Sequence, residues 1–171
     1  MEEYVVRTTV DRRAMTALAR AARKTLRRRR SRLVHTFGMA VTAVMLVLAL
    51  GNWMIGDRTW WLNLALALLM LVVTASEDTV NGLAGLRQVQ PGSREVTAEF
   101  TGEHYVHQTG TAVSLWQYYK VQAVCETGEY FILLLASRHG PVYAKEGFTR
   151  GTPMAFRDFI SRKTGKLIVY L

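Results

Sequence analysis

Few side chains of this sequence are spaced for catalysis or for metal binding. His104 and His107 come nearest to a ligand pair, but three residues apart in an extended segment they point to opposite faces. Cys125 is the single cysteine, and its sequence neighbours include no His or basic residue that would activate the thiol. We therefore expect no metal site, no cofactor, and a small buried Cys125 that does not act as a nucleophile.

The sequence also lacks the motifs of common enzyme classes. It contains no G-x-S-x-G, no P-loop and no G-x-G-x-x-G. Glu126 and Glu129 flank a turn at Thr127 and Gly128, and we expect both carboxylates to be solvated. An enzyme acting at a membrane surface would have to assemble its acid, base or nucleophile from distant residues. We therefore expect a protein without enzymatic activity.

One cluster of aromatic and cationic residues could form a binding surface. Trp116, Tyr118 and Tyr119 precede Lys120, and exposed aromatic and cationic side chains are enriched at interfaces. The alternative is that these residues form the edge of a sheet core, because the aromatic residues of such small sheets usually point inward. The sequence favours the core interpretation.

Two long apolar runs dominate the first half of the chain. Residues 33–56 and 59–76 contain no Asp, Glu, Lys or Arg, and only Asp57 and Arg58 separate them. As helices these runs would be about 36 and 27 Å long, compared with about 30 Å for the hydrocarbon layer of a bilayer. Neither run has the polar stripe of a soluble bundle helix, and both are longer than the core of a cleavable signal peptide. The pattern predicts a hairpin of two transmembrane helices.

The charges are distributed unevenly along the chain. The 171 residues carry a net charge of +9, and residues 1–32 hold 11 Lys or Arg against three Asp or Glu. Five arginines lie directly before the first apolar run: Arg27, Arg28, Arg29, Arg30 and Arg32. The positive-inside rule accounts for this cluster, and capture of anionic lipid headgroups is a second role that it could have. Both explain the charge better than nucleic-acid binding does.

Trp53, Trp60 and Trp61 lie around the connection between the two apolar runs. Tryptophans gather in this way in the aromatic belt at a membrane interface. With the arginines inside and this connection outside, both termini are expected in the cytoplasm. Gly38 and Thr42 form a small-xxx-small pair that could pack helices or associate copies of the chain.

Two further segments flank the apolar runs. Residues 1–32 alternate as a strand and then, after Asp11, follow the pattern of a basic amphipathic helix, which we expect at the cytoplasmic membrane surface. Residues 77–171 alternate as short antiparallel strands, and Thr152 and Pro153 begin a helix at about 153–164. The predicted fold is an α+β membrane protein, with a transmembrane hairpin at 33–76 and a small antiparallel domain at 77–171 capped by a C-terminal helix.

Several core and turn positions in the second half of the chain follow a family pattern. They are Phe100, Gly102, Trp116, Tyr118, Lys120, Val121, Glu126, Tyr130, Phe131, Leu133, Lys145, Phe148, Phe156 and Ile160. With these residues and this order of elements, nearly the whole chain resembles the YcxB-like family of small bacterial membrane proteins. The resemblance implies a C-terminal domain similar to a pleckstrin-homology fold, and no established enzymatic function. The family's usual proline before the lysine is absent, since Ala144 precedes Lys145.

Together these observations predict a multi-pass protein of the bacterial inner membrane. Its partners would be the lipid bilayer and an unidentified protein, with the cytoplasmic domain binding that protein or the membrane surface. The alternative is an oligomeric channel or transporter subunit, in which two helices per chain would multiply around a pore. A pump or proton relay normally needs ionisable groups within the membrane, and the two runs contain none apart from His35 at the inner edge.

Overall fold

The protein has an α+β fold, confirming the predicted class. The computed structural model describes residues 3–135 and 140–171, apart from the side chains of Arg30 and Pro91. The chain divides into two units, one made of Met1–Arg27 with Asp78–Leu171 and the other of Arg28–Glu77. The sequence predicted segments at 1–32, 33–76 and 77–171. In the structure the first strand of the chain joins a sheet formed by the C-terminal segment, and residues 1–27 and 78–171 form one unit.

The larger unit contains a five-stranded antiparallel sheet. Its order is β4-β3-β2-β1-β8. The strands are β1 (Tyr4–Thr9), β2 (Glu95–Phe100), β3 (His104–Thr109), β4 (Val113–Gln117) and β8 (Phe148–Arg150). In β1 the inward-facing Tyr4 and Val6 lie opposite Phe100 and Ala98 of β2. Burial of these alternate residues fixes the register, since a shift of one residue would expose them.

A second, four-stranded sheet has the order β7-β6-β5-β9. Its strands are β5 (Ala123–Glu126), β6 (Tyr130–Leu134), β7 (Val142–Ala144) and β9 (Ile168–Tyr170). The strand β9 runs parallel to β5, whereas the other pairs are antiparallel. The two sheets meet where the Ala144 amide of β7 donates to Thr8 Oγ1 of β1, at 2.8 Å.

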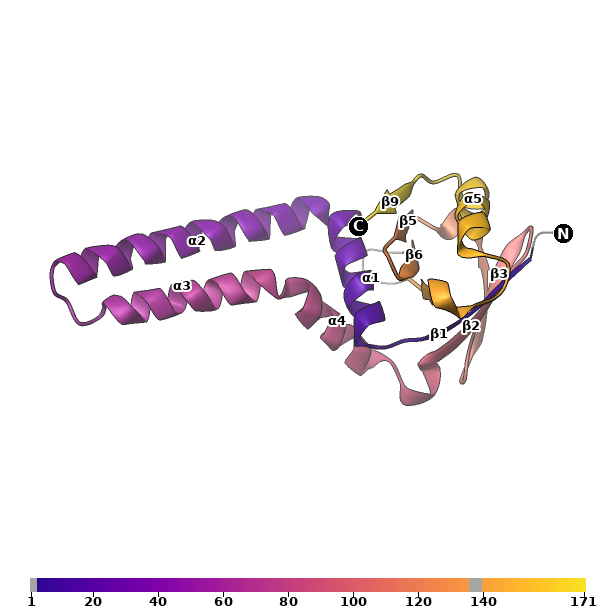
Figure 1. Ribbon diagram of the computed structural model, residues 1–171, viewed down its shortest axis with the longest axis horizontal. Coiled ribbons are helices and arrows are strands. Elements are labelled where there is room, and N and C mark those ends of the chain that lie inside the picture. Colours follow the sequence, from indigo (N-terminus) through magenta and orange to yellow (C-terminus); the bar gives the residue numbers. More distant parts are fainter. Residues whose placement is uncertain (1–2, 136–139) are drawn as a thin grey trace. The chain divides into compact units, whose positions relative to one another are not determined.

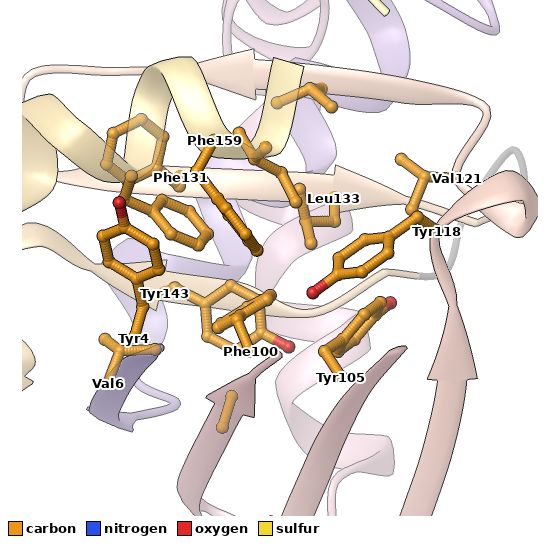
Figure 2. Close-up of a cluster of buried hydrophobic side chains, with 14 of the residues drawn as sticks. Tyr4, Val6, Phe100, Tyr105, Tyr118, Val121, Phe131, Leu133, Tyr143 and Phe159 are labelled. Carbon is orange, nitrogen blue, oxygen red and sulfur yellow. The ribbon is translucent and has the colours of Figure 1, made fainter. Parts of the chain in front are cut away.

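The core between the sheets is aromatic, and the last helix closes it (Figure 2). Phe100 lies 5.2 Å from Tyr143 and 4.7 Å from Phe156, measured between ring centroids. Phe156 belongs to α5 (Pro153–Thr164), which begins as predicted at Thr152, whose hydroxyl accepts from the Ala155 amide. The predicted capping helix is therefore confirmed.

The basic helix α1 (Arg12–Lys24) also begins as predicted, with Asp11 accepting from the Ala14 amide at 2.8 Å. The structure shows what its apolar face contacts. Its apolar face is buried against the second sheet, in a cluster that contains Ala14, Leu18, Ala21, Ala22, Cys125, Ile132, Leu134 and Val142. This face is therefore not free to enter a membrane surface.

The helix α4 (Glu77–Gln88) packs closely against α1. A Cβ atom at Gly82 would lie 2.7 Å from the backbone nitrogen of Thr16, so only glycine allows this approach. Beside this contact, Arg23 of α1 forms two hydrogen bonds to the carboxylate of Asp78, both at 2.7 Å. At least one of the cations of α1 is therefore bound within the domain.

The smaller unit is a helical hairpin made of α2 (Arg28–Met54) and α3 (Trp60–Ala75), which run antiparallel and side by side (Figure 1). Within α2, the segment Ser31–Met54 is long and apolar enough to cross a membrane. The helix α3 has 16 residues and meets the same criterion only together with α4, from which Ser76 separates it. The helix α2 is thus a clear candidate for crossing a membrane. Within the described residues, a second candidate exists only if α3 and α4 together count as one bent span.

Burial of His107 gives the larger unit a testable pH response. His107 faces inward from β3, and its Nδ1 lies 3.2 Å from the Tyr143 hydroxyl. Burial lowers the pKa of His107, so the unfolded chain takes up a proton first as the pH falls below about 6.5. We expect the melting temperature to fall over this range, and His107→Gln to flatten the decline.

His104→Gln is the matched control for this response, because His104 lies on the other face of β3. Thermal unfolding of the detergent-solubilised protein, followed by circular dichroism at several pH values, measures the effect. An unchanged pH dependence in His107→Gln would contradict the assignment.

Candidate membrane-contact site

Small and polar side chains lie at the contact between α2 and α3. The least exposed residues of α2 include Ser31, Gly38, Thr42 and Ala49. They are separated by seven, four and seven residues, which is the spacing of one helix face in a left-handed pair of helices. On α3, Ala67 is 1% exposed. We call these five residues the seam.

Gly38 allows the two helices of the hairpin to approach closely. A Cβ atom at this position would lie 2.8 Å from Thr74 Oγ1 of α3. The hydroxyls of Thr42 and Thr74 donate to the carbonyls of Gly38 and Met70, so these two groups are satisfied within their own helices. The predicted small-residue pair at Gly38 and Thr42 therefore does lie at a helix contact, within one chain.

The large apolar side chains of the hairpin point outward. On α2, Phe37 is 69% and Val47 70% exposed. On α3, Leu69 is 57% and Val72 60% exposed. A water-soluble helical hairpin has the opposite arrangement, with large apolar residues buried and polar residues outside. The hairpin thus presents an apolar surface that water does not solvate favourably, and small residues at the helix contact are typical of packing in lipid.

No family model, curated protein or solved structure matches this chain. The site must therefore be interpreted from its own residues.

The two ends of the hairpin differ in their chemistry. At the end where α2 begins, His35 Nε2 lies 2.9 Å from a carboxylate oxygen of Glu77. At the connection, the Asn52 side chain donates to Thr59 Oγ1 at 3.0 Å, and Asp57 accepts from the Thr59 amide at 2.9 Å. The sequence placed His35 at the inner edge of the first apolar run but did not predict its contact with Glu77, which lies 42 positions away.

The arginines of the predicted basic cluster occupy different environments. Arg28, Arg29 and Arg32 are exposed on the first turns of α2, whereas Arg27 precedes that helix and is partly buried. The side chain of Arg30 lies outside the described part of the chain. Three guanidinium groups are therefore available at this end of the hairpin to meet anionic groups.

The predicted tryptophan belt lies around the other end of the hairpin. Trp53 is 63% exposed in the last turn of α2. Trp60 and Trp61 begin α3 and are 39% and 56% exposed. These three indoles thus flank the connection, at the end of the hairpin opposite to the arginines.

We call the larger unit the β domain, and within it the cluster that could have formed a binding surface, Trp116, Tyr118, Tyr119 and Lys120, is divided between core and surface. Tyr118 is buried in the core, and its hydroxyl donates to the Thr101 carbonyl at 2.6 Å. Burial raises the pKa of this phenol. Trp116 packs against the core with Lys120 6.0 Å from its ring centroid, whereas Tyr119 and Lys120 are exposed. The core interpretation therefore holds for Trp116 and Tyr118, and the four residues do not form one surface.

Two further sequence predictions concern reactive groups. Cys125 is buried, as predicted, and burial raises the pKa of its thiol to about 11. Among the described residues, no group of three or more His, Cys, Asp or Glu side chains is placed to hold a metal ion. Cys125 is therefore an unreactive thiol of the core near neutral pH.

The prediction of a solvated Glu126 was wrong. This carboxylate is 3% exposed and accepts from Lys145 at 2.7 Å and from Arg157 at 2.6 and 2.8 Å. Burial acts to raise the pKa of Glu126, but the hydrogen bonds from Arg157 and Lys145 outweigh it and lower the pKa below its ordinary value. One signal for burial was present in the sequence, because the apolar Val124 and Cys125 beside Glu126 occupy both faces of β5.

Proposed function

We propose that the protein is a non-enzymatic protein of the bacterial inner membrane, in which α2 and α3 both cross the bilayer and anchor a cytoplasmic protein-binding domain. The observation that carries this proposal is the arrangement of the hairpin, with its seam of small and polar residues and its large apolar side chains outward. Such a surface is stable when hydrocarbon surrounds it. The charged groups of the hairpin lie at its ends, where headgroups and water are found.

The shortness of α3 is compatible with a second span. Its 16 residues reach about 24 Å, a few ångströms less than the usual hydrocarbon thickness. Bilayers accommodate short spans by thinning locally at modest cost. The packing of α3 along α2 supports the same depth for both helices.

The orientation follows from the two ends of the hairpin. The exposed arginines Arg28, Arg29 and Arg32 are expected on the cytoplasmic side under the positive-inside rule. The connection with its tryptophans is then outside, and both termini with the β domain are inside. The resemblance to the YcxB-like family, with its pleckstrin-homology-like domain, remains a prediction.

The β domain better supports binding of a protein than binding of the bilayer. Its amphipathic helix α1 already buries its apolar face against the second sheet. Apolar side chains elsewhere on the domain remain exposed, among them Val113, Leu115 and Tyr119. Exposed aliphatic and aromatic groups of this kind are suited to contact with another protein.

Cysteine labelling in a bacterial host tests the proposed topology. In a Cys125→Ala background, Asp57→Cys marks the connection and Glu99→Cys marks the β domain. An impermeant maleimide should label residue 57 in intact cells, and residue 99 only after the inner membrane is opened. Equal labelling of both sites in intact cells, or of neither after opening, would contradict a hairpin with an outer connection.

The arginines should also give the protein a preference for anionic lipid. Each cation near an anionic leaflet contributes about 1 kcal/mol. We expect the combined change of Arg28, Arg29 and Arg32 to Gln to reduce the enrichment of anionic over neutral lipid around the protein in mixed nanodiscs, measured by native mass spectrometry. Arg58→Gln removes one cation at the opposite end of the hairpin and is the control, which should reduce the enrichment much less than the triple change does. Equal enrichment in the triple variant would show that these arginines serve orientation alone.

A further inference from the structure

The strand β4 forms an open edge of the five-stranded sheet. Among the described residues, β4 pairs with β3 and has no strand on its other side. The remaining edges are short or covered. The strand β7 lies against β1, while β8 and β9 have three residues each. The five-residue strand β4 is thus the longest edge available for pairing.

The register of β4 determines which backbone groups face outward. The turn between β3 and β4 is closed by the Thr109 amide donating to the Ala112 carbonyl at 2.8 Å. In an antiparallel pair, hydrogen-bonded and non-bonded residue pairs alternate. Thr109 and Ala112 form a hydrogen-bonded pair, so every second residue after Ala112 also faces β3. The residues between them, Val113, Leu115 and Gln117, therefore direct their N–H and C=O groups away from β3. These three residues can therefore pair with a further strand.

The side chains on this edge are apolar and uncharged. Val113 is 66% and Leu115 61% exposed, and the partly buried Val106 lies beside Leu115 on the same face of the sheet. No Asp, Glu, Lys or Arg occurs from His104 to Tyr119. Exposed edges usually carry a charge, a proline or a bulge that discourages pairing, and β4 has no charge or proline.

We propose that β4 is a homodimer interface, at which β4 of a second copy pairs antiparallel about a two-fold axis through Leu115. In this register residues 113, 115 and 117 lie opposite residues 117, 115 and 113 of the partner. All the outward backbone groups of both β4 strands are then satisfied. The five-stranded sheets of the two copies join into one sheet of ten strands.

The second copy fits this edge for two reasons. Because β4 carries no formal charge, it can lie opposite β4 of a second copy without repulsion. A charged edge strand would place like charges opposite each other. The two Leu115 side chains would also meet between the two Val106 side chains, so each copy covers the apolar edge of the other. A two-fold pair is closed and leaves no edge of β4 for further copies.

This inference rests on the protein-binding part of the proposed function and names the partner. It does not depend on insertion of the hairpin into a bilayer. Failure of the topology experiment and failure of the association experiment are therefore distinguishable.

Cross-linking of the full-length, detergent-solubilised protein tests the interface. In a Cys125→Ala background, Leu115→Cys should form a covalent dimer with a short bifunctional thiol reagent, because residue 115 lies opposite itself. Thr149→Cys, on the opposite edge strand β8, is the matched control and should stay monomeric. Equal cross-linking at the two positions, or none at residue 115, would overturn the proposal.

A second variant tests how strongly β4 contributes to the equilibrium between monomer and dimer. Leu115→Lys places two lysines opposite each other and removes the apolar pair, so the dimer dissociation constant should rise about tenfold or more. Thr149→Lys adds the same charge at the other edge and should leave the constant unchanged. Light scattering over a concentration series gives both values. A wild-type chain that is monomeric throughout, or that pairs through β4 only with a different protein, would also overturn the proposal.

Discussion

Replacing Gly147 with valine should lower the free energy of unfolding of the β domain by about 3 kcal/mol. Gly147 lies just before β8, where the chain passes directly against β1. A Cβ atom at residue 147 would overlap the carbonyl oxygen of Arg7 and lie 2.9 Å from its carbonyl carbon. Backbone atoms cannot move aside as a flexible side chain can, so β1 would have to shift from its place in the sheet.

Urea unfolding of the detergent-solubilised protein, followed by circular dichroism, measures this loss. Gly128→Ala is the control, because a Cβ atom at that turn has no neighbour within 4 Å. We expect it to change stability by about 0.5 kcal/mol or less. Wild-type stability in Gly147→Val would mean that β1 does not join the C-terminal sheet as described.

The second large effect is expected from Glu126→Ala, which should also cost about 3 kcal/mol. The change removes the carboxylate that accepts hydrogen bonds from both Lys145 and Arg157. Lys145 is then left with a side chain that is only 21% exposed and has lost its counter-ion. Glu129→Ala at the exposed end of the same hairpin is the matched control and should be nearly neutral.

The pH dependence of this ion pair has a defined sign. Because the pKa of Glu126 is lowered in the folded state, its contribution is present above the unfolded value of about 4.5. It is lost as the pH falls below that value through the folded pKa. The difference in stability between wild type and Glu126→Ala should therefore shrink in acid, and a difference that is constant down to pH 3 would contradict the assignment.

Local signals in the sequence predicted several elements correctly. Asp11 and Thr152 cap their helices, and Gly165 ends α5 with a φ of 63°, in the left-handed region that suits glycine. Each of these features depends on residues a few positions apart. Alternation of buried residues likewise identified β2, since Val96, Ala98 and Phe100 are buried.

Contacts between distant segments were not predictable from such signals. The location of β1 between β2 and β8, and the sheet that covers α1, depend on the topology of the whole domain. Glu126 illustrates the same limit, because its partners lie 19 and 31 residues away. Tyr118 and Tyr119 lie in a short 3-10 turn after β4, and the contact of the Tyr118 hydroxyl with the Thr101 carbonyl likewise joins residues 17 positions apart.

The hairpin was predictable from the sequence only in part. Its apolar length was evident from the sequence, but the sequence could not show which residues face the neighbouring helix. The structure places small residues there and turns the large ones outward. This arrangement supports the membrane interpretation by a physical argument that composition alone does not supply.

Spin labels at Val47 of α2 and Leu69 of α3 test whether both helices of the hairpin lie in the hydrocarbon of a bilayer. Both residues are outward-facing and lie well inside their helices. In liposomes, power-saturation EPR should show that both labels collide readily with oxygen and rarely with a water-soluble nickel complex, as expected in hydrocarbon. If the nickel complex reaches either label as easily as it reaches one at Glu99, that helix does not lie in the bilayer, and the protein is not anchored by a transmembrane hairpin.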